Sequence, residues 1–227
     1  MTEPPTPLEG LEGFDGGDVS VPRYRVCQPT SASLKDKGAT EGQFFDDAAG
    51  ASFESSTIVP LLLQKKRVMF EEGADKPTCK SEDNKVPSVP EPQAPACTEM
   101  RGNRAVEICK NAIWKDRVPP ICRLVYELTA LDLDRGGVPF RLQIKGTATP
   151  AAKKLAQQVM MNKVSLFDLS CTMSLYKKKN ARGSFYVIDF GGFEVLERGT
   201  HRAAFLDARA YDAGQGVKED EESIIPF

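Results

Sequence analysis

The alternation of apolar and polar residues along the chain predicts a mainly β protein. Strand-like stretches occur at 21–27, 42–47, 56–70, 121–133, 138–145, 164–176 and 184–190. The stretch 56–70 is expected to form a central β-element of one or two strands, with Lys65, Lys66 and Arg67 at its turn or exposed edge. In 138–145, apolar residues alternate one by one with polar residues, so one face of this strand is expected to be buried. Because a turn with two glycines, at 134–137, separates 121–133 from 138–145, these two stretches are expected to form an antiparallel hairpin.

A helical pattern occurs in the second half of the chain. Thr149 and Pro150 are favourable at a helix start, and the apolar residues that follow share one helix face as far as about Met161. A second, short helix is expected within 199–211. Several short strands with hairpin connections and one or two helices favour an OB-fold-like Greek-key barrel.

Three polar segments interrupt this pattern and suggest the domain organisation. Residues 1–20 are rich in Pro, Gly and acids and are expected to be disordered, and 212–227 are expected to form a flexible acidic tail. Between them, 21–211 form the expected domain, with a cysteine-containing insertion at 71–120. No apolar run is long enough to span a membrane and the N-terminus does not resemble a signal peptide, so a cytoplasmic location is expected.

The net charge of −2 conceals a strong polarity along the chain. Residues 1–20 carry five acids and no base, and residues 212–227 carry five acids and one lysine, which leaves +7 on residues 21–211. Residues 141–182 concentrate nine bases against one acid, Asp168. A basic body between acidic ends is typical of a protein that binds polyanions. The alternative is that +7 over so many residues is ordinary surface charge.

The basic region includes tyrosines at the spacing of a hairpin. A basic turn is expected at 177–183, between two strands that carry Tyr176, Phe185 and Tyr186. Proteins that bind single strands use cations for phosphates and aromatic rings for bases, and each stacked base contributes roughly 1–3 kcal/mol. The alternative is a solvated turn with every ring in the core. We favour exposure of both tyrosines. The candidate DNA-binding residues are Arg141, Lys145, Lys153, Lys154, Lys163, Tyr176, Lys177, Lys178, Lys179, Arg182 and Tyr186.

Four cysteines, Cys79, Cys97, Cys109 and Cys122, lie in or next to the polar insertion, which has few aliphatic residues of its own. No CxxC pair is present, so the local signature of a zinc ribbon is missing. Thiolate–zinc bonds can, however, supply the folding free energy that a segment without a core lacks. We therefore expect one structural zinc held by these four residues. The alternative is that they are small apolar residues, as is expected of Cys27 and Cys171 in strand patterns.

Signals for enzyme chemistry are few, and we expect a non-enzymatic protein. The chain has one histidine, His201, and no GxxxxGK[ST] phosphate loop. Asp132 and Asp134 could hold a catalytic metal, as the carboxylates of nucleases do, but they adjoin a Gly-Gly turn, where Asp is common. A metal-dependent nuclease is therefore the less favoured alternative.

The chain ends in four consecutive acids followed by a short apolar tip, Ile224-Ile225-Pro226-Phe227. An acidic run that ends in Ile-Pro-Phe resembles the C-terminal tail of bacterial and phage single-stranded-DNA-binding proteins. In that family the tail recruits replication and repair proteins and competes with DNA for the basic surface. The alternative is a solubilising acidic terminus. The resemblance implies partner binding by Glu219, Asp220, Glu221, Glu222, Ile224, Ile225, Pro226 and Phe227.

A looser resemblance covers most of 21–190. The segments 22–28, 42–45, 79–83, 122–126, 149–155 and 184–186 are similar, in order, to short motifs of a group of phage-encoded replication or recombination factors. The expected function is sequence-tolerant binding of single-stranded DNA in phage replication, recombination or repair. The alternative is a zinc-stapled adaptor that binds replication or recombination proteins without contacting DNA.

Overall fold

The computed structural model describes residues 21–70, 77–88, 96–102, 104–113, 115, 118, 120–181 and 183–215. Its helices are α1 (Ala32–Asp36), α2 (Thr149–Asn162) and α3 (Arg202–Gln215). Its strands are β1 (Arg23–Val26), β2 (Phe44–Asp46), β3 (Ala51–Phe53), β4 (Ser55–Met69), β5 (Cys79–Ser81), β6 (Thr98–Arg101), β7 (Arg104–Glu107), β8 (Cys122–Asp132), β9 (Val138–Lys145), β10 (Leu169–Asn180) and β11 (Gly183–Val195). The expected mainly β class is confirmed, with three α-helices in place of the one or two expected.

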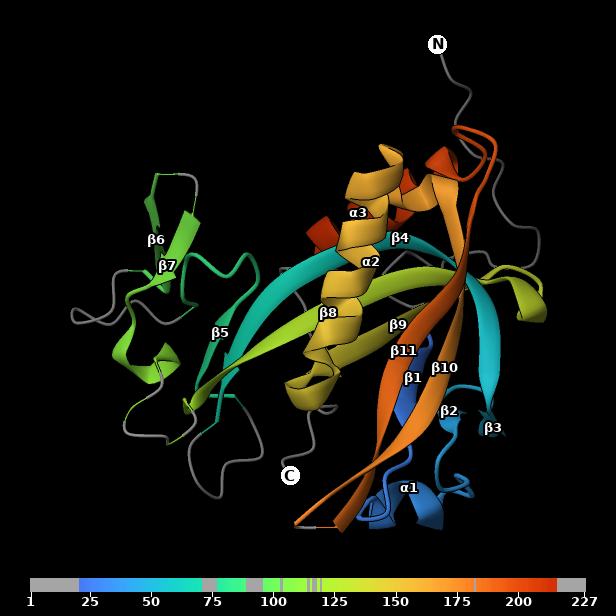
Figure 1. Cartoon of the computed structure of the whole chain (residues 1–227), viewed down its shortest axis with the longest axis horizontal. Helices are drawn as coiled ribbons and strands as arrows, with labels where there is room; N and C mark the ends of the chain where they lie inside the picture. Colours follow the sequence, from blue (N-terminus) through green and yellow to red (C-terminus); the bar gives the residue numbers. More distant parts are fainter. Residues whose placement is uncertain are drawn as a thin grey trace, which may run out of the picture.

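Nine of the strands form one curled sheet, in the order β11-β10-β4-β8-β9-β1-β2-β3, with β5 added beside β4 (Figure 1). The expected β8–β9 hairpin is present, with Val125 opposite Lys145 and Asp132 opposite Val138. The β1–β9 pair is parallel, whereas the other strand pairs of this sheet are antiparallel. A single long-range parallel pair thus joins the N-terminal strands to the rest of the sheet.

The main core lies between the curled sheet and α2. Ala152 and Leu155 of α2 are fully buried together with Leu128 of β8, Phe140 of β9 and Phe190 of β11. Helix α2 contacts β11, β9 and β8, and Figure 1 shows it crossing the sheet in this region. Cys27 and Cys171 are almost completely buried, as expected for core thiols.

The segment at 56–70 differs from its expected form. The expected central position is confirmed, since β4 lies between β10 and β8. The strand is continuous, however, and has no turn at Lys65, Lys66 and Arg67. Lys65 is exposed, whereas Lys66 and Arg67 are buried at 7% and 2% exposure. The prediction of an exposed basic edge was wrong because ion pairs with Glu127 and Glu107 make burial of these two cations possible.

The cysteine-containing insertion lies at the far end of β4 and β8, away from the main core (Figure 1). Its strand β5 pairs with the end of β4, and β6 and β7 form a separate two-stranded hairpin. The insertion therefore has its own regular structure.

Helix α3 packs against β4 near the C-terminal end of the described chain. Its Asp212 accepts a hydrogen bond from Gln64 of β4, and Phe205 stacks on Phe167 with ring centroids 4.9 Å apart. Within the described part of the chain, no helix is long and apolar enough to cross a membrane.

Candidate nucleic-acid interface

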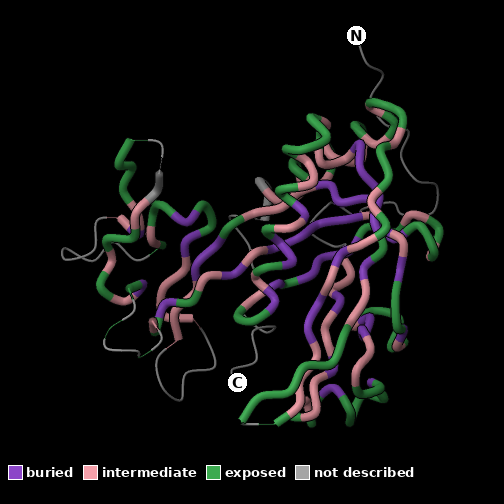
Figure 2. The backbone as a smooth tube through the Cα atoms, viewed as in Figure 1, coloured by how far each residue is buried: buried purple, intermediate pink, exposed green. Residues whose placement is uncertain are grey.

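The β10–β11 hairpin continues well beyond the sheet and forms a two-stranded projection. Strand β10 pairs with β4 at Cys171–Ser174, whereas its pairing with β11 continues to Asn180 opposite Gly183. We call residues 175–188 the arm. It extends roughly 20 Å beyond the β4 pairing at the usual rise per residue, and its outer part is largely exposed (Figure 2).

The lysines of the arm lie on a strand and not on a turn. The basic turn was expected to begin at Lys177, but β10 continues through Lys179 to Asn180. All three lysines, Lys177, Lys178 and Lys179, are exposed. Because neighbouring residues of a strand face opposite ways, the lysines are divided between the two faces of the arm.

Each face of the arm carries one tyrosine beside one lysine. Tyr176 lies opposite Val187, and Tyr186 lies opposite Lys177, so the two tyrosines are on opposite faces. The Nζ atom of Lys178 is 5.2 Å from the centre of the Tyr176 ring, and that of Lys177 is 5.7 Å from the Tyr186 ring. These are cation–π distances, and the tyrosine–lysine pairs combine a flat ring with a positive charge.

The two tyrosines differ in how far their rings are open to a ligand. Tyr176 is 42% exposed. Tyr186 is half-buried and lies against Gly42, where a Cβ atom would come within 2.6 Å of its ring. The exposure predicted for both tyrosines therefore describes Tyr176 well and Tyr186 only in part.

The side chain of Gln28 holds the arm next to the end of β1. Its Nε2 donates to the Tyr186 carbonyl and its Oε1 accepts from the Tyr186 amide, both at 2.8 Å. The amide group of this side chain thus occupies the place of a neighbouring strand on the open edge of β11. Gly42 has a positive φ of +79° and leaves room for the Tyr186 ring, so the short segment 27–43 forms a seat for the arm.

The three basic residues of α2 and its C-terminal end differ in their exposure and in their contacts. Lys153 is exposed, whereas Lys154 pairs with Asp189 of β11 at 2.9 Å. Lys163 ends α2 in a left-handed conformation, with φ of 53°, and is exposed. Lys153 also lies close to Lys65 of β4. The pKa of Lys65 is lowered chiefly by burial, then by the charge of Arg67, and to a smaller extent by the charge of Lys153.

Arg141 belongs to an internal ion-pair network and does not face solvent. It is 6% exposed, lies 3.2 Å from Asp212 and 3.7 Å from Glu127, and its guanidinium group is 5.0 Å from the Tyr211 ring. These contacts fix α3 to the sheet. The strand pattern at 138–145 placed Arg141 on the polar face correctly, but α3 covers this part of the face.

A second basic group forms where β1, β8 and β9 meet. Lys145, at the end of β9, has its pKa lowered to about 8 by burial, then by the positive charges of Arg123 and Arg25. Arg123 is exposed, and Arg25 also pairs with Asp47 at 2.6 Å. Arg25 and Arg123 were not among the expected DNA-binding residues. Lys145 was among the expected DNA-binding residues. The sequence does not reveal the parallel β1–β9 pairing that brings Lys145 close to the two arginines.

The carboxylates considered for a nuclease are occupied by structural hydrogen bonds. Asp132 is fully buried and accepts from Tyr24 at 2.9 Å, from Ser56 at 2.5 Å and from Arg135 at 2.5 Å. Asp134 accepts from the backbone amide of Thr57 at 2.8 Å. Burial and the bond to Asp132 raise the pKa of Tyr24. Both acids thus connect the β8–β9 turn to neighbouring strands.

The four cysteines expected to hold zinc come together in one region. Cys79 and Cys122 pair with Met69 from opposite sides of β4. The carbonyl oxygen of Cys97 accepts from the backbone amide of Cys109 at 3.4 Å, at the base of the β6–β7 hairpin. Among the described residues, however, no group of three or more His, Cys, Asp or Glu side chains is arranged to hold a metal ion.

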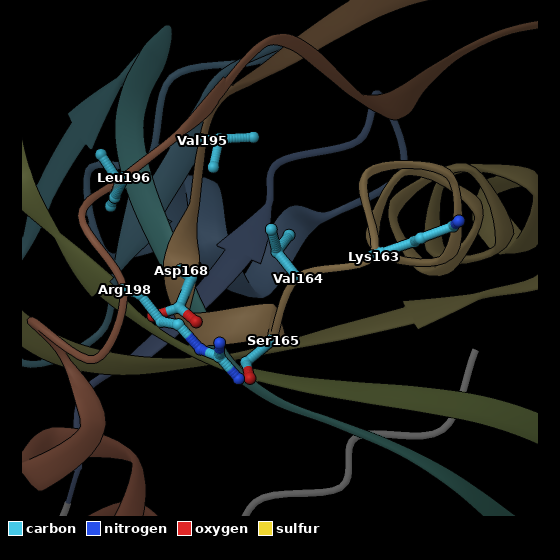
Figure 3. Close-up of a pocket in the computed structure, with 7 residues that line it drawn as sticks. All are labelled: Lys163, Val164, Ser165, Asp168, Val195, Leu196 and Arg198. Carbon is cyan, nitrogen blue, oxygen red and sulfur yellow. The ribbon is translucent and has the colours of Figure 1, made fainter.

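A cavity lies where β10 begins and β11 ends, close to Lys163 (Figure 3). Val164, Val195 and Leu196 form its apolar lining, and Asp168 and Arg198 are its other charged residues. Asp168 is 2% exposed, and its carboxylate accepts from the amide of Gly199 at 2.7 Å. In Figure 3 the Lys163 side chain points away from the other lining residues, so the cavity does not unite the expected DNA-binding residues.

Several expected features fall outside the described residues. These are the acidic segment 1–20, Arg182, and 216–227 of the expected tail, whose first residues, 212–215, belong to α3. They remain predictions from the sequence.

The described features define a mainly β protein whose curled sheet carries a projecting basic arm with an exposed tyrosine. The chain belongs to the Pam3 phage gp34-like protein family, whose model matches residues 2–219. This description agrees with the expected phage origin. Searches of the curated proteins and of the solved structures gave no match.

Proposed function

We propose that this protein binds single-stranded DNA without strong sequence preference, as a non-enzymatic factor in phage DNA replication, recombination or repair. The observation that carries the proposal is the arm, which presents Tyr176 and three exposed lysines beyond the body of the sheet. The described residues of the arm include no acid. A flat ring next to exposed positive charges is the combination that single-strand binding needs.

Tyr176 is the residue proposed to stack on a base. Its ring is open to solvent, and Lys178 already lies over the ring at a cation–π distance. A phosphate next to a stacked base would therefore meet a positive charge. Tyr186 is proposed to orient the arm, because its ring is seated against Gly42 and its backbone is bound by Gln28.

The second basic group, Arg25, Arg123 and Lys145, is proposed as a further phosphate contact. Arg123 and Arg25 each act on Lys145 as a like charge, and a bound polyanion would offset that repulsion. Of the residues expected from the sequence, Lys153 and Lys163 remain candidates because they are exposed. Arg141 is assigned to the internal network instead.

An OB-like barrel is the proposed fold for this activity. The sheet is curled, and Gln28 bridges the end of β1 to the open edge of β11. OB folds bind single strands on the face of a curled sheet and its adjoining loops. The tail at 219–227 is proposed to recruit replication or recombination proteins, on the basis of its resemblance to the tails of single-stranded-DNA-binding proteins.

Titration of the full chain with fluorescent single-stranded and duplex oligonucleotides of the same length tests the proposal. Binding to the single strand is expected to weaken steeply with salt, and binding to the duplex is expected to be weaker at every salt concentration. Equal affinity for both forms would overturn the proposal, and so would the absence of binding at low salt, which would favour an adaptor without DNA contact. Deletion of 217–227 should preserve or tighten DNA binding and abolish partner recruitment.

A further inference from the structure

We infer that Cys79, Cys97, Cys109 and Cys122 form a structural site for a thiophilic divalent cation, most simply Zn²⁺, which stabilises the insertion at the end of β4 and β8. The inference rests on the burial pattern and on the positions of the cysteines. It does not depend on the proposed DNA binding.

The burial pattern of the insertion is the reverse of that of an ordinary small domain. Its buried side chains are small or polar, and its large apolar side chains are exposed. Ser81, Asn84, Cys97 and Ala112 are 2–5% exposed, whereas Val86, Met100, Ile108, Ile113 and Val118 are 36–64% exposed. The described part of the insertion therefore lacks a hydrophobic core, and apolar burial does not explain its regular structure.

Hydrogen bonds alone are a weak substitute for the missing core. Arg67 donates to the Asn84 side chain at 2.7 Å and pairs with Glu107, and Thr98 donates to the Asn84 carbonyl at 3.0 Å. A typical hydrogen bond contributes only about 0.5–1.5 kcal/mol net. Metal–thiolate bonds contribute far more to folding, and small modules without an apolar core commonly use them.

The four thiols lie near one another, although they come from separate elements. Cys97 is close enough to both Cys79 and Cys109 to interact electrostatically, and Cys122 is close enough to Cys97 and Cys109. Cys97 therefore lies near each of the other three cysteines. The β4 register brings in Cys79 and Cys122, and the base of the β6–β7 hairpin brings in Cys109. Two donors are thus positioned by pairing with β4, and the other two by the ends of the β6–β7 hairpin, without a CxxC spacing.

The charge of such a site fits its surroundings. Four thiolates around one Zn²⁺ carry a net charge of two minus, which is costly to bury unless a cation lies near. Arg67 is 2% exposed and acts electrostatically on both Cys97 and Cys122. The four side chains do not form a metal-holding group as they stand in the described structure, so metal binding requires the thiols to turn toward one another.

Metal analysis of the full chain, purified under reducing conditions from cells supplied with zinc, tests the inference. About one zinc per chain is expected. Serine substitution of Cys79, Cys97, Cys109 or Cys122 should each reduce the zinc content to near zero. The matched controls are Cys27→Ala and Cys171→Ala, which alter buried thiols outside the group and should keep the full zinc content.

A measurement on the unaltered chain guards against variants that fail to fold. Removal of zinc and addition of Co²⁺ should give the thiolate-to-cobalt charge-transfer absorption of a tetrahedral thiolate site, and zinc should displace it. Clearly substoichiometric zinc together with no cobalt–thiolate absorption would overturn the inference. Disulfides among the four cysteines in the freshly reduced and repurified chain would overturn it as well.

Discussion

Replacing the three lysines of the arm by glutamine is the most direct test of the proposed interface. Lys177, Lys178 and Lys179 are exposed on β10, and their side chains are long enough to reach a strand that crosses the narrow arm. Glutamine removes each charge and keeps a similar length. The substitution is therefore expected to weaken single-strand binding and reduce its salt dependence, with little effect on folding.

The size of the effect follows from counterion release. Each phosphate contact contributes about 0.7 to the slope of log K against log salt for single strands, so three contacts contribute about 2. At 0.1 M salt this corresponds to roughly a 100-fold loss of affinity, or about 3 kcal/mol. Because the register places Lys178 on the face of Tyr176 and the other two lysines on the opposite face, Lys178→Gln alone should lower the slope by about 0.7.

The assay is fluorescence anisotropy with a labelled oligo-dT over a range of salt concentrations. The matched control replaces Lys85, Lys110 and Lys115 by glutamine, which removes the same charge from exposed positions in the insertion. The control should leave the slope almost unchanged. A decrease in the arm variant smaller than the 0.7 of one contact, or an equal decrease in the control, would refute the assignment of the arm as the phosphate-binding surface.

Three further predictions concern single residues. Tyr176→Ala should cost about 1–3 kcal/mol of single-strand affinity, measured by the same assay, and Tyr176→Phe should retain most of it, because stacking needs only the ring. Since the pKa of Lys145 is lowered to about 8, DNA affinity should fall between pH 7 and pH 9, and in Lys145→Arg this fall should be much smaller. The folded chain then binds fewer protons than the unfolded chain, so stability should rise with pH from about 8 toward the ordinary lysine pKa. Asp132→Asn should destabilise the fold by about 1–3 kcal/mol in urea unfolding, because the buried Tyr24 and Ser56 hydroxyls lose their charged acceptor. Asp134→Asn should cost less, and an equal loss would contradict the structural role of Asp132.

Local patterns were sufficient for most strands and for α2, and long-range pairing explains most of the differences. The alternation at 138–145 predicted β9 because its apolar face is buried under α2. The same pattern could not show that α3 would cover Arg141 on the polar face, since that depends on the contact of Asp212 with residues far away in sequence. Buried Arg67 and Lys66 were misassigned for a similar reason, because their acidic partners lie 40 and 61 residues away.

The candidate site was predictable in composition and less so in geometry. Lysines beside tyrosines indicated a single-strand-binding hairpin, and the structure places three of the lysines on it. The sequence could not show that Tyr176 and Tyr186 face opposite ways, because this follows from the register across β10 and β11. Nor could it show the group formed by Arg25, Arg123 and Lys145, which needs the parallel pairing of β1 with β9.

The short segment from Arg25 to Gln28 connects the two proposed DNA-contacting surfaces. Arg25 contributes to the basic group at the end of β9, and three residues later Gln28 holds the backbone of Tyr186 in the arm through two hydrogen bonds of 2.8 Å. Because β1 is itself fixed between β9 and β2, the arm and the basic group cannot shift independently without breaking these bonds. The distance between the two surfaces is thus set by one strand, so a single strand of DNA that spans both should lose affinity when Gln28 is replaced by Ala, even though Gln28 itself need not contact the DNA.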